Sequence, residues 1–488
     1  MIKELPEERL ASTDERGKRV YLFPADVRGK YHTRRMMFQW ILMALFVVLP
    51  WIQINGHPAI LLDIAQRRFA IFGMTFWAHD APMLVFVFGS VFLGVSLITA
   101  VWGRIWCGWA CPETVFVERL YRQIERWIEG NAVQRKRLSD GPWTGEKLLK
   151  KGAKWAVFTF ISWQLAHAFL AYFIGTEALA EMMVSPPSEH PTAFFSMMFI
   201  TLVLLFSFGW FREQFCIIMC PYGRFQSVLM DEDSMVVGYD EKRGEPRRGT
   251  PEAEAGVTGD CINCYQCVQV CPTGVDIRRG VQMECVACTA CIDACDTIMD
   301  RVNKPRGLIR YTSYNDLQRQ IPVESSPENA PRTWTQKYKY LMYNIFRARV
   351  IILSVALSGV LAGLSYVLIT RPPIKATVFN AKGTPYEVLS QTDNEVVLTN
   401  RYYVVASNYT FVPGTLRLVP PEGVEIISQA NPIPLNGGEE KNRGFFLRFN
   451  KNLLTQGSAR IQLTLQSRAE DDSWQYVGTQ EVPLVGPY

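Results

Sequence analysis

Eight of the twelve cysteines in the chain lie between Cys261 and Cys295 and form two runs with the same spacing. Each run has the pattern Cys-x2-Cys-x2-Cys-x3-Cys, with Cys261, Cys264, Cys267 and Cys271 in the first and Cys285, Cys288, Cys291 and Cys295 in the second. Thiolates are soft ligands that suit iron–sulfur chemistry, and spacing this short lets one loop hold three corners of a cubane. The runs therefore predict metal-bound thiolates in a reducing compartment and exclude a disulfide framework.

The repeated spacing is that of bacterial two-cluster ferredoxins, in which the fourth cysteine of each run ligates the other cluster. We therefore expect two [4Fe–4S] clusters with crossed ligand sets: Cys261, Cys264, Cys267 and Cys295 for one, and Cys285, Cys288, Cys291 and Cys271 for the other. Structural zinc sites are the alternative, but zinc usually takes Cys-x2-Cys pairs that lie far apart in sequence. Pro272 follows the first run, whereas Asp296 follows the second, so we expect the local turn to differ there.

The remaining four cysteines form two pairs, each within the pattern aromatic-Cys-x3-Cys-Pro-x3-Phe. One copy extends from Trp106 to Phe116 and the other from Phe215 to Phe225, which makes them an internal repeat. A proline disfavours helix at the residue before it and can itself begin a new helix. Each pair follows an apolar run by a few residues, so we expect both pairs at the same face of a membrane.

Four thiolates brought together by this repeat could bind a soft metal such as Cu(I), hold a third cluster or form redox-active disulfides. The alternative is that all four are inert buried residues, because free cysteine packs well in apolar surroundings. The repetition favours a redox or metal role. The candidate redox and copper-binding residues are therefore Cys107, Cys111, Cys216 and Cys220.

Five apolar runs could position these cysteines at a membrane. A membrane-spanning helix needs roughly 20 predominantly apolar residues. Five runs without Asp, Glu, Lys or Arg approach that length: Met36–Ile54, Met83–Val101, Trp155–Ile174, Ala193–Phe211 and Val350–Ile369. The N-terminal segment before them is too polar and too long for the start of a cleaved signal peptide, so we expect the first run to be a retained anchor.

The distribution of Lys and Arg predicts the orientation of the chain. The N-terminal segment, the loop after the second run and the segment after the fourth run are rich in Lys and Arg, whereas residues 175–192 contain none. Arg67 and Arg68 are exceptions, because they fall in the first outer loop. We therefore expect the N-terminus and both cysteine runs inside, and the C-terminus outside after five crossings.

The C-terminal part of the chain predicts a small β-sandwich, because short β-rich stretches alternate there with turn residues. It contains no Cys or His, which argues against a metal site in this part. The stretches are Glu395–Leu398, Thr415–Val419, Val424–Ser428, Gly444–Phe449, Arg460–Gln466 and Trp474–Val477.

The composition fits a membrane protein with polar domains. The chain has 488 residues, of which 48% are hydrophobic and 20% are charged, and its formal net charge is +5. Pro and Gly contents are ordinary, which excludes a collagen-like or disordered chain. A charge this mild gives no reason to expect a nucleic-acid partner, since basic membrane loops produce the same balance.

Together, these residues resemble the FixG/RdxA/CcoG type of cytochrome c oxidase accessory proteins. The resemblance covers nearly the whole chain and includes both Cys-x3-Cys-Pro elements, the eight-cysteine region, the last crossing and the outer β-sandwich. Membrane subunits of the NapH and NosR type share the cysteine motifs, but the outer sandwich favours the accessory family. The resemblance implies a bacterial inner-membrane protein that reduces Cu(II) to Cu(I) for a C-type haem–copper oxidase, with a periplasmic immunoglobulin-like domain.

The expected function is therefore membrane-bound iron–sulfur electron transfer, with copper as substrate or transient ligand and cupric reductase as the enzyme activity. Oxidase subunits and copper chaperones or transporters are the implied partners, and the electron donor is not indicated. The first alternative is a quinol dehydrogenase that conducts electrons to a periplasmic reductase. The second is a non-redox scaffold for oxidase assembly.

The expected fold is an α-helical membrane protein with five crossings, a two-cluster bacterial-type ferredoxin domain and a C-terminal immunoglobulin-like β-sandwich. The expected parts are a cytoplasmic segment at 1–35, a four-crossing membrane domain at 36–230, a cytoplasmic ferredoxin-type domain with linkers at 231–349, a fifth crossing at 350–370 and a periplasmic domain at 371–488.

Overall fold

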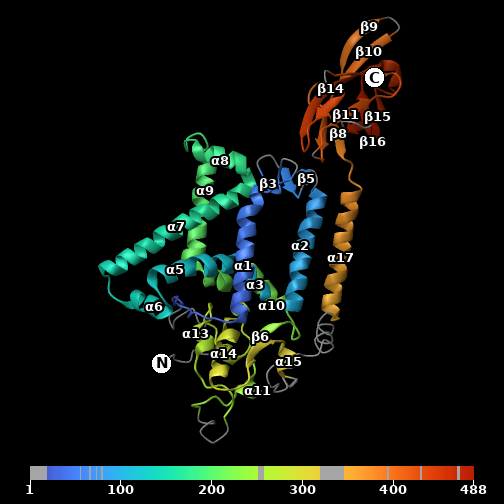
Figure 1. Cartoon of the computed structure of the whole chain (residues 1–488). Coiled ribbons are helices and arrows are strands. Elements are labelled where there is room, and N and C mark those ends of the chain that lie inside the picture. Colours follow the sequence, from blue (N-terminus) through green and yellow to red (C-terminus); the bar gives the residue numbers. More distant parts are fainter. Residues whose placement is uncertain are drawn as a thin grey trace. The chain divides into compact units, whose positions relative to one another are not determined.

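The structure is a computed structural model that describes residues 19–54, 57–64, 68–72, 74–77, 81–250, 258–318, 346–392, 395–410, 412–428, 431–469 and 473–487. The chain forms two compact units (Figure 1). The first comprises Met1–Leu49, Leu84–Ala171 and Glu177–Gly363, and the second Pro50–Met83, Tyr172–Thr176 and Leu364–Tyr488. All twelve cysteines belong to the first unit, so the candidate sites can be described within it.

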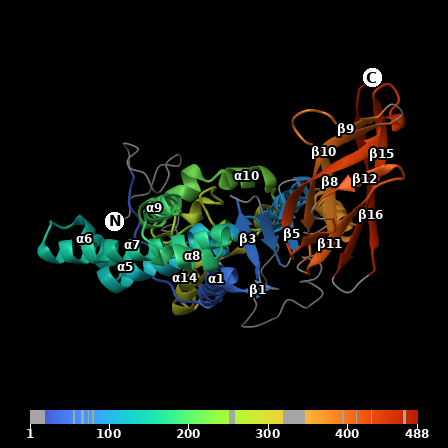
Figure 2. The ribbon, with the colours of Figure 1, turned by 90° about the horizontal axis from the view of Figure 1, so that it is seen from above.

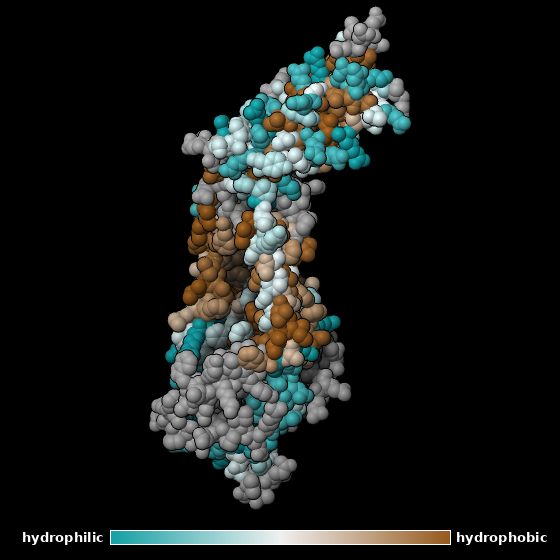
Figure 3. Space-filling model, turned by 90° about the vertical axis from the view of Figure 1, so that its right-hand side faces the viewer, coloured by the Kyte–Doolittle hydropathy of each residue, from teal (hydrophilic) through white to brown (hydrophobic). Residues whose placement is uncertain are grey.

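Five helices among the described residues are long and apolar enough to cross a bilayer, in agreement with the five apolar runs. They are α1 Lys30–Val48, α2 Ala81–Trp102, α7 Gly145–Ile174, α9 Pro191–Leu204 with its continuation η4 Leu205–Phe211, and α17 Ala348–Ile369. Many of their large apolar side chains are exposed, and Figure 3 shows hydrophobic residues gathered on the helical part of one face. Exposed apolar surface of this extent is typical of helices that contact lipid.

Two of these helices have boundaries that differ from the apolar runs. Helix α1 ends at Val48 and is followed by a 3-10 turn, so the expectation of helix as far as Ile54 is wrong. Pro50 lies in that turn, where its missing N–H and fixed backbone angle favour the end of a helix. Helix α7 begins ten residues before Trp155, at Gly145, because its first turns carry lysines that find acidic partners.

Short helices carry the two cysteine pairs and connect the long helices. After α2 come α3 Ile105–Trp109, α4 Pro112–Phe116, the π-helix η3 Val117–Tyr121, α5 Arg122–Glu129 and α6 Ala132–Asp140. Helix α8 Thr176–Val184 lies between α7 and α9, and the π-helix η5 Phe215–Met219 and α10 Pro221–Leu229 follow η4. Both Pro112 and Pro221 occupy the first turn of a helix, as the Cys-Pro motif predicts.

The eight-cysteine region folds around a two-stranded antiparallel sheet and short helices. Strand β6 Val236–Tyr239 pairs with β7 Ile309–Thr312, with Val236 opposite Thr312. Its helices are α11 Glu241–Gly244, α13 Gln266–Gln269, η6 Ile277–Arg279, α14 Ala290–Arg301 and α15 Tyr314–Gln318. The core of this region contains both apolar residues and cysteines, so the thiols are part of its packing.

Between the first two long helices, the chain forms short strands that the sequence does not predict. They belong to the second unit. They are β1 Gln53–Ile54, β2 His57–Pro58, β3 Ile60–Asp63, β4 Arg68–Ile71 and β5 Met74–Trp77.

The C-terminal part of the second unit is a two-sheet β structure. The five-stranded sheet contains β8 Ile374–Asn380, β9 Glu387–Thr392, β10 Glu395–Asn408, β12 Val424–Ile427 and β14 Glu440–Asn450. The four-stranded sheet contains β11 Gly414–Val419, β13 Ile433–Leu435, β15 Ser458–Ala469 and β16 Gln475–Val485, and a 3-10 turn, η7 Lys451–Leu453, follows β14. In Figure 2, several of these strands run side by side as long ribbons.

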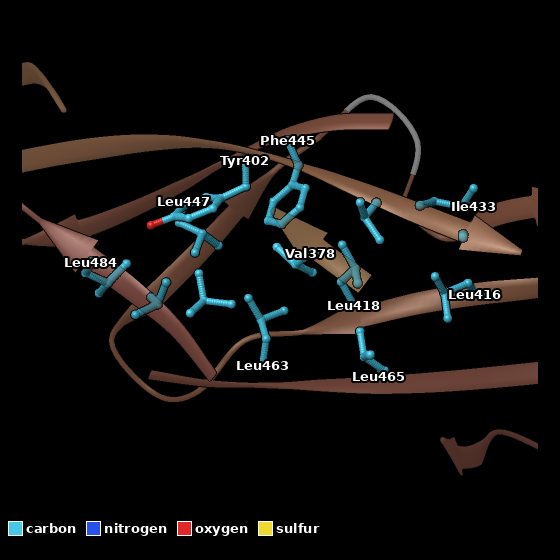
Figure 4. Packing of buried hydrophobic residues seen from close by; sticks show 14 of the residues in the cluster. Val378, Tyr402, Leu416, Leu418, Ile433, Phe445, Leu447, Leu463, Leu465 and Leu484 are labelled. Atoms are coloured by element: carbon cyan, nitrogen blue, oxygen red, sulfur yellow. The ribbon is translucent and has the colours of Figure 1, made fainter. Parts of the chain in front are cut away.

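One hydrophobic core joins the two sheets, as the alternating stretches predict (Figure 4). Leu447 and Tyr402 from one sheet and Leu416 and Leu463 from the other are almost completely buried in it. All six predicted β-rich stretches overlap strands, whereas β8, β9 and β13 were not predicted. The prediction of a C-terminal β-rich region is therefore confirmed.

Candidate functional site

The first cluster site is a cavity in the eight-cysteine region. Four thiols line it together: Cys261, Cys264, Cys267 and Cys295. Three come from the first run, and the fourth is the last cysteine of the second run, on α14. Apolar side chains such as Met299 and Leu308 complete the wall.

The second cluster site is a neighbouring cavity with the reciprocal composition. It is lined by Cys285, Cys288, Cys291 and Cys271, of which Cys271 comes from the first run, and also by Cys267. The two cavities are similar in size. Each cavity is thus lined by one of the two crossed sets of four thiols, and Cys267 lines both cavities.

The two cysteine loops adopt the same backbone conformation. Asn263 and Tyr265 in the first run have positive φ angles of 58°, and the matching residues Ala287 and Thr289 in the second have φ angles of 52° and 65°. Non-glycine residues seldom adopt positive φ, so two matched pairs indicate a shared loop geometry. The runs differ after their fourth cysteine, as expected from Asp296. Helix α14 continues through this residue, and the Asp296 carboxylate accepts a hydrogen bond from the Gly307 N–H at 3.0 Å.

The chemistry of both cavities fits an iron–sulfur cluster. Burial raises the pKa of Cys267 and that of Cys285 to about 12, so these thiols need a cationic partner to ionise near neutral pH. Sets of four soft sulfur ligands in apolar surroundings select iron–sulfur clusters among common metal groups. Among the described residues, no group of three His, Cys, Asp or Glu side chains is placed to hold a single metal ion.

The four remaining cysteines form the membrane-face site. Cys107 lies on α3 and Cys216 on η5, whereas Cys111 and Cys220 immediately precede α4 and α10. Burial raises the pKa of Cys216, and the other three thiols each add to that rise, so all four are within electrostatic reach of one another. Both pairs of the repeat therefore lie near one another, and a shared site for them stays a prediction. The Sγ atom of Cys107 also donates a hydrogen bond to Gln226 Oε1 at 3.4 Å.

The membrane-face site is packed directly against the second cluster site. Cys107 contacts the apolar cluster that includes Cys288. A Cβ atom added to Gly108 would lie 2.5 Å from Val286 O and 2.8 Å from the Cα atom of Cys288, so only glycine permits this approach. The thiols of α3 are thus held next to those of the second run.

Side chains of neighbouring elements reinforce this contact. Arg35 of α1 donates a hydrogen bond from Nη1 to the carbonyl oxygen of Cys288 at 2.8 Å. Trp109 Nε1 donates to Tyr311 Oη at 3.1 Å, and that hydroxyl donates to the carbonyl oxygen of Ala287 at 3.4 Å. Arg104 donates to the carbonyl oxygens of Met283 and Gly223, so it links the second cysteine run to α10.

Comparison with known proteins places the chain in a family. It is 36% identical over 377 residues to Protein RdxA of Cereibacter sphaeroides, covering 76% of this chain and 77% of that protein. The chain belongs to the FixG/RdxA family. Protein RdxB of the same organism is 37% identical over 381 residues, covering 76% of this chain and 77% of RdxB. Nitrogen fixation protein FixG of Rhizobium meliloti is 34% identical over 392 residues, covering 76% of this chain and 74% of FixG.

Two domain families also match this FixG/RdxA-family chain. A family described as 4Fe-4S dicluster domain matches residues 211–314, which include the eight-cysteine region. A family described as 4Fe-4S binding domain matches residues 84–132 and 190–231, the two segments that contain the Cys-x3-Cys-Pro elements. The chain is therefore an iron–sulfur electron-transfer protein, and the five long apolar helices among its described residues are consistent with a membrane protein.

The FixG/RdxA-family chain also contains a buried ion-pair cluster that its sequence does not reveal. Glu125 of α5 lies at its centre and accepts hydrogen bonds from Arg212 at 2.7 and 3.1 Å. Arg135 and Lys154 approach the same carboxylate at 3.4 and 3.5 Å. In the sequence these basic residues indicate only the side of the membrane on which they lie. The acidic residues interspersed among them are the sequence feature that could have indicated buried ion pairs.

A second contact missed by sequence reasoning joins α1 to α14. The Asp293 carboxylate accepts hydrogen bonds from the backbone N–H groups of Tyr31 and His32, at 3.2 and 2.6 Å. It thus caps the first turn of a membrane helix from a position between Cys291 and Cys295. Figure 1 shows α14 at the lower end of α1.

Proposed function

We propose that this chain delivers electrons one at a time to Cu(II) and supplies the resulting Cu(I) for the assembly of a C-type haem–copper cytochrome c oxidase. One observation carries the proposal: the three thiol sites are neighbours within one unit of the chain. Cys267 lines both cluster cavities, and Cys107 contacts the apolar cluster that contains Cys288. This arrangement supports electron transfer from the eight-cysteine region to the membrane-face site.

Each part of the chain has a distinct role in this proposal. Bound [4Fe–4S] clusters would supply one-electron transfer at the two cluster sites, held by the crossed sets of four cysteines. Apolar residues around the thiols exclude water. Gly108 and Arg35 hold the membrane-face elements against the second run. These residues keep the sites in a fixed arrangement, so no large movement is needed between uptake and delivery of an electron.

Copper suits the membrane-face site as an electron acceptor. Soft thiolates stabilise Cu(I) relative to Cu(II), so copper in contact with Cys107, Cys111, Cys216 or Cys220 would more readily accept an electron. The balance is simple, since one electron from a reduced cluster site converts one Cu(II) to Cu(I). A third iron–sulfur cluster is the alternative occupant of this site, because a 4Fe-4S binding family matches the same segments. In that case copper would receive its electron from the third cluster.

The proposal includes a location. The chain lies in the bacterial inner membrane with its N-terminus and cluster sites in the cytoplasm. Its C-terminal β unit lies in the periplasm, has an immunoglobulin-like fold and contacts oxidase subunits or copper chaperones. The support for this location is the distribution of Lys and Arg along the sequence.

Serine variants of the membrane-face pairs test the proposal. In Cys107→Ser/Cys111→Ser, and separately in Cys216→Ser/Cys220→Ser, we expect at least a tenfold loss in the rate at which Cu(II) reoxidises dithionite-reduced protein. Iron content and the EPR signals of the two cluster sites should stay unchanged. Met219→Leu, in the same π-helix as Cys216, is the matched control and should keep the full rate.

Other outcomes would favour the alternative functions. Full Cu(II) reduction in both serine variants would show that copper is reduced elsewhere. Rapid reduction of the cluster sites by a quinol, with no effect of Cu(II), would favour a quinol dehydrogenase. If neither quinol nor Cu(II) changes the EPR signals, the chain is a scaffold.

A further inference from the structure

The two cluster sites share one loop geometry but differ in the charge beside their thiols. Matched positive φ angles give both cysteine runs the same backbone course. The first cavity is lined by Arg278, whereas no Lys or Arg is among the described residues that line the second. Because the loop conformation is the same, this difference in nearby charge should give the two sites different reduction potentials.

Arg278 is held rigidly at the first cavity. Its side chain is 1% exposed, and it binds the Asp276 carboxylate through Nε at 2.8 Å and Nη2 at 2.6 Å. Nη1 donates to Asn263 Oδ1 at 2.6 Å, and the guanidinium lies 4.0 Å from the centre of the Tyr265 ring. Both Asn263 and Tyr265 belong to the first cysteine run. Their counterparts in the second run, Ala287 and Thr289, offer neither the amide oxygen nor the ring.

The charge of Arg278 acts on a cluster thiol. Arg278 and Cys267 line the same cavity, so the guanidinium charge lies beside the thiols of the first site. Asp276 partly offsets the charge, but its carboxylate is not among the described groups that line the cavity. The guanidinium is therefore the nearer of the two charges to whatever the thiols bind.

Two other arginines lie near the second site. Arg35 donates to the carbonyl oxygen of Cys288, and Arg104 donates to that of Met283, just before the second run. Arg104 also lines a separate cavity with Cys285, but neither arginine is among the described residues that line the second cluster cavity. Hydrogen bonds and positive charge near the sulfurs both favour the reduced, more negative state.

We propose that Arg278 raises the reduction potential of the first cluster site above that of the second, so that the first site accepts the first of two electrons. Arg278 is a positioning residue in this proposal, because it acts through the field that it places beside Cys267. The first site then holds one electron in reserve for the second site. Cys288 of the second site belongs to the apolar cluster that Cys107 contacts. The proposal rests on the cluster assignment of the proposed function but does not depend on copper as the acceptor.

EPR-monitored titration with dithionite, on the full-length protein with both clusters, tests the proposal. Two one-electron couples are expected, and Cys264→Ser identifies the couple of the first site, because Cys264 lines only the first cavity. In Arg278→Gln, the couple of the first site should fall by about 59 mV, a tenfold change in its one-electron equilibrium. The second couple should remain in place.

Two further variants separate charge from structure. Arg278→Lys keeps the charge and should restore most of the potential. Arg279→Gln, at the exposed next position of η6, removes an equal charge and should change neither couple. An unshifted first couple in Arg278→Gln, or equal shifts in both couples, would overturn the proposal. Absence of both couples from the unmodified protein would instead contradict the cluster assignment.

Discussion

Gly108 shows how one residue can determine the distance between two redox sites. Gly108 directly follows Cys107 in the Cys-x3-Cys-Pro element. It packs against backbone atoms of Val286 and Cys288. Backbone atoms yield less readily than the end of a flexible side chain. Any side chain at this position would therefore push α3 away from the second cysteine run.

Gly108→Ala should separate the membrane-face site from the second cluster site. The added methyl group would meet backbone at 2.5 and 2.8 Å, and overpacking of this kind costs about 1–3 kcal/mol. We expect unchanged iron content, a lower thermal midpoint and slower reoxidation of the reduced clusters by Cu(II). Gly152→Ala in α7 is the matched control, because an added Cβ there meets no neighbouring atom of the described residues within 4 Å. Equal reoxidation rates in the two variants would contradict the role of this contact.

Among the elements, α5 joins the short helices to the long ones through buried ion pairs. Glu125 of α5 binds Arg212, which directly follows η4, and Lys154 of α7. Burial alone would raise the pKa of Glu125, but the Arg212 guanidinium and the other basic groups hold it at about 2. A carboxylate so placed is charged at every physiological pH, and its loss would leave several buried cations without a partner.

Glu125→Gln should therefore be strongly destabilising. Removal of one partner from a buried ion pair costs about 3–5 kcal/mol, because the remaining charge stays desolvated. We expect a clearly lower midpoint of thermal unfolding in detergent at pH 7. Glu146→Gln, which alters an exposed carboxylate on α7, should change it little.

The same residue predicts a pH dependence. The folded pKa of Glu125 lies below the ordinary value of about 4.3 for an unfolded chain. Its stabilising contribution is therefore complete above that value and is lost as the pH falls toward about 2. The difference in thermal midpoint between the unmodified protein and Glu125→Gln should be constant from pH 7 to about pH 5 and should narrow below it. A difference that grows on acidification would contradict this assignment.

The cluster ligands could be grouped from the sequence because spacing limits which thiols one loop can bring together. Cys271 is the informative case. Its place beside Cys285 follows from the crossed pattern and not from proximity in sequence. The long helices could be predicted for a similar reason, since apolar length alone identifies them. Each of these signals is local or periodic.

Contacts between distant segments could not be predicted in this way. Nothing near Gly108 in the sequence indicates that Cys288, 180 positions away, packs on it. Arg212 and Glu125 lie 87 residues apart, and their pairing depends on how the helices pack. The π-helical turn after α9 is a further example, because Arg212 follows it with a φ angle of 49°, which apolar periodicity does not predict.

For the whole molecule, the decisive question is which side of the membrane each unit faces. Basic residues favour the inner side for the cluster sites and the outer side for the C-terminal β unit. Reporter fusions after Gln318 and after Arg371 should therefore report opposite compartments, since α17 lies between them. An alkaline phosphatase fusion should be active only at the second position, and a cytoplasmic reporter only at the first. Activity of one reporter at both positions would refute a crossing by α17.

The cap that Asp293 provides for α1 has a consequence for the order of events during synthesis. The N–H groups of Tyr31 and His32 leave the ribosome about 260 residues before the carboxylate that binds them. At 5–20 residues per second, that interval lasts roughly 13 to 52 s. During this interval the N–H groups of Tyr31 and His32 at the start of helix α1 lack their carboxylate cap. The cap comes from the segment that also carries Cys291 and Cys295. The cap therefore cannot form before Asp293 has been synthesised, two residues before the last cysteine, Cys295.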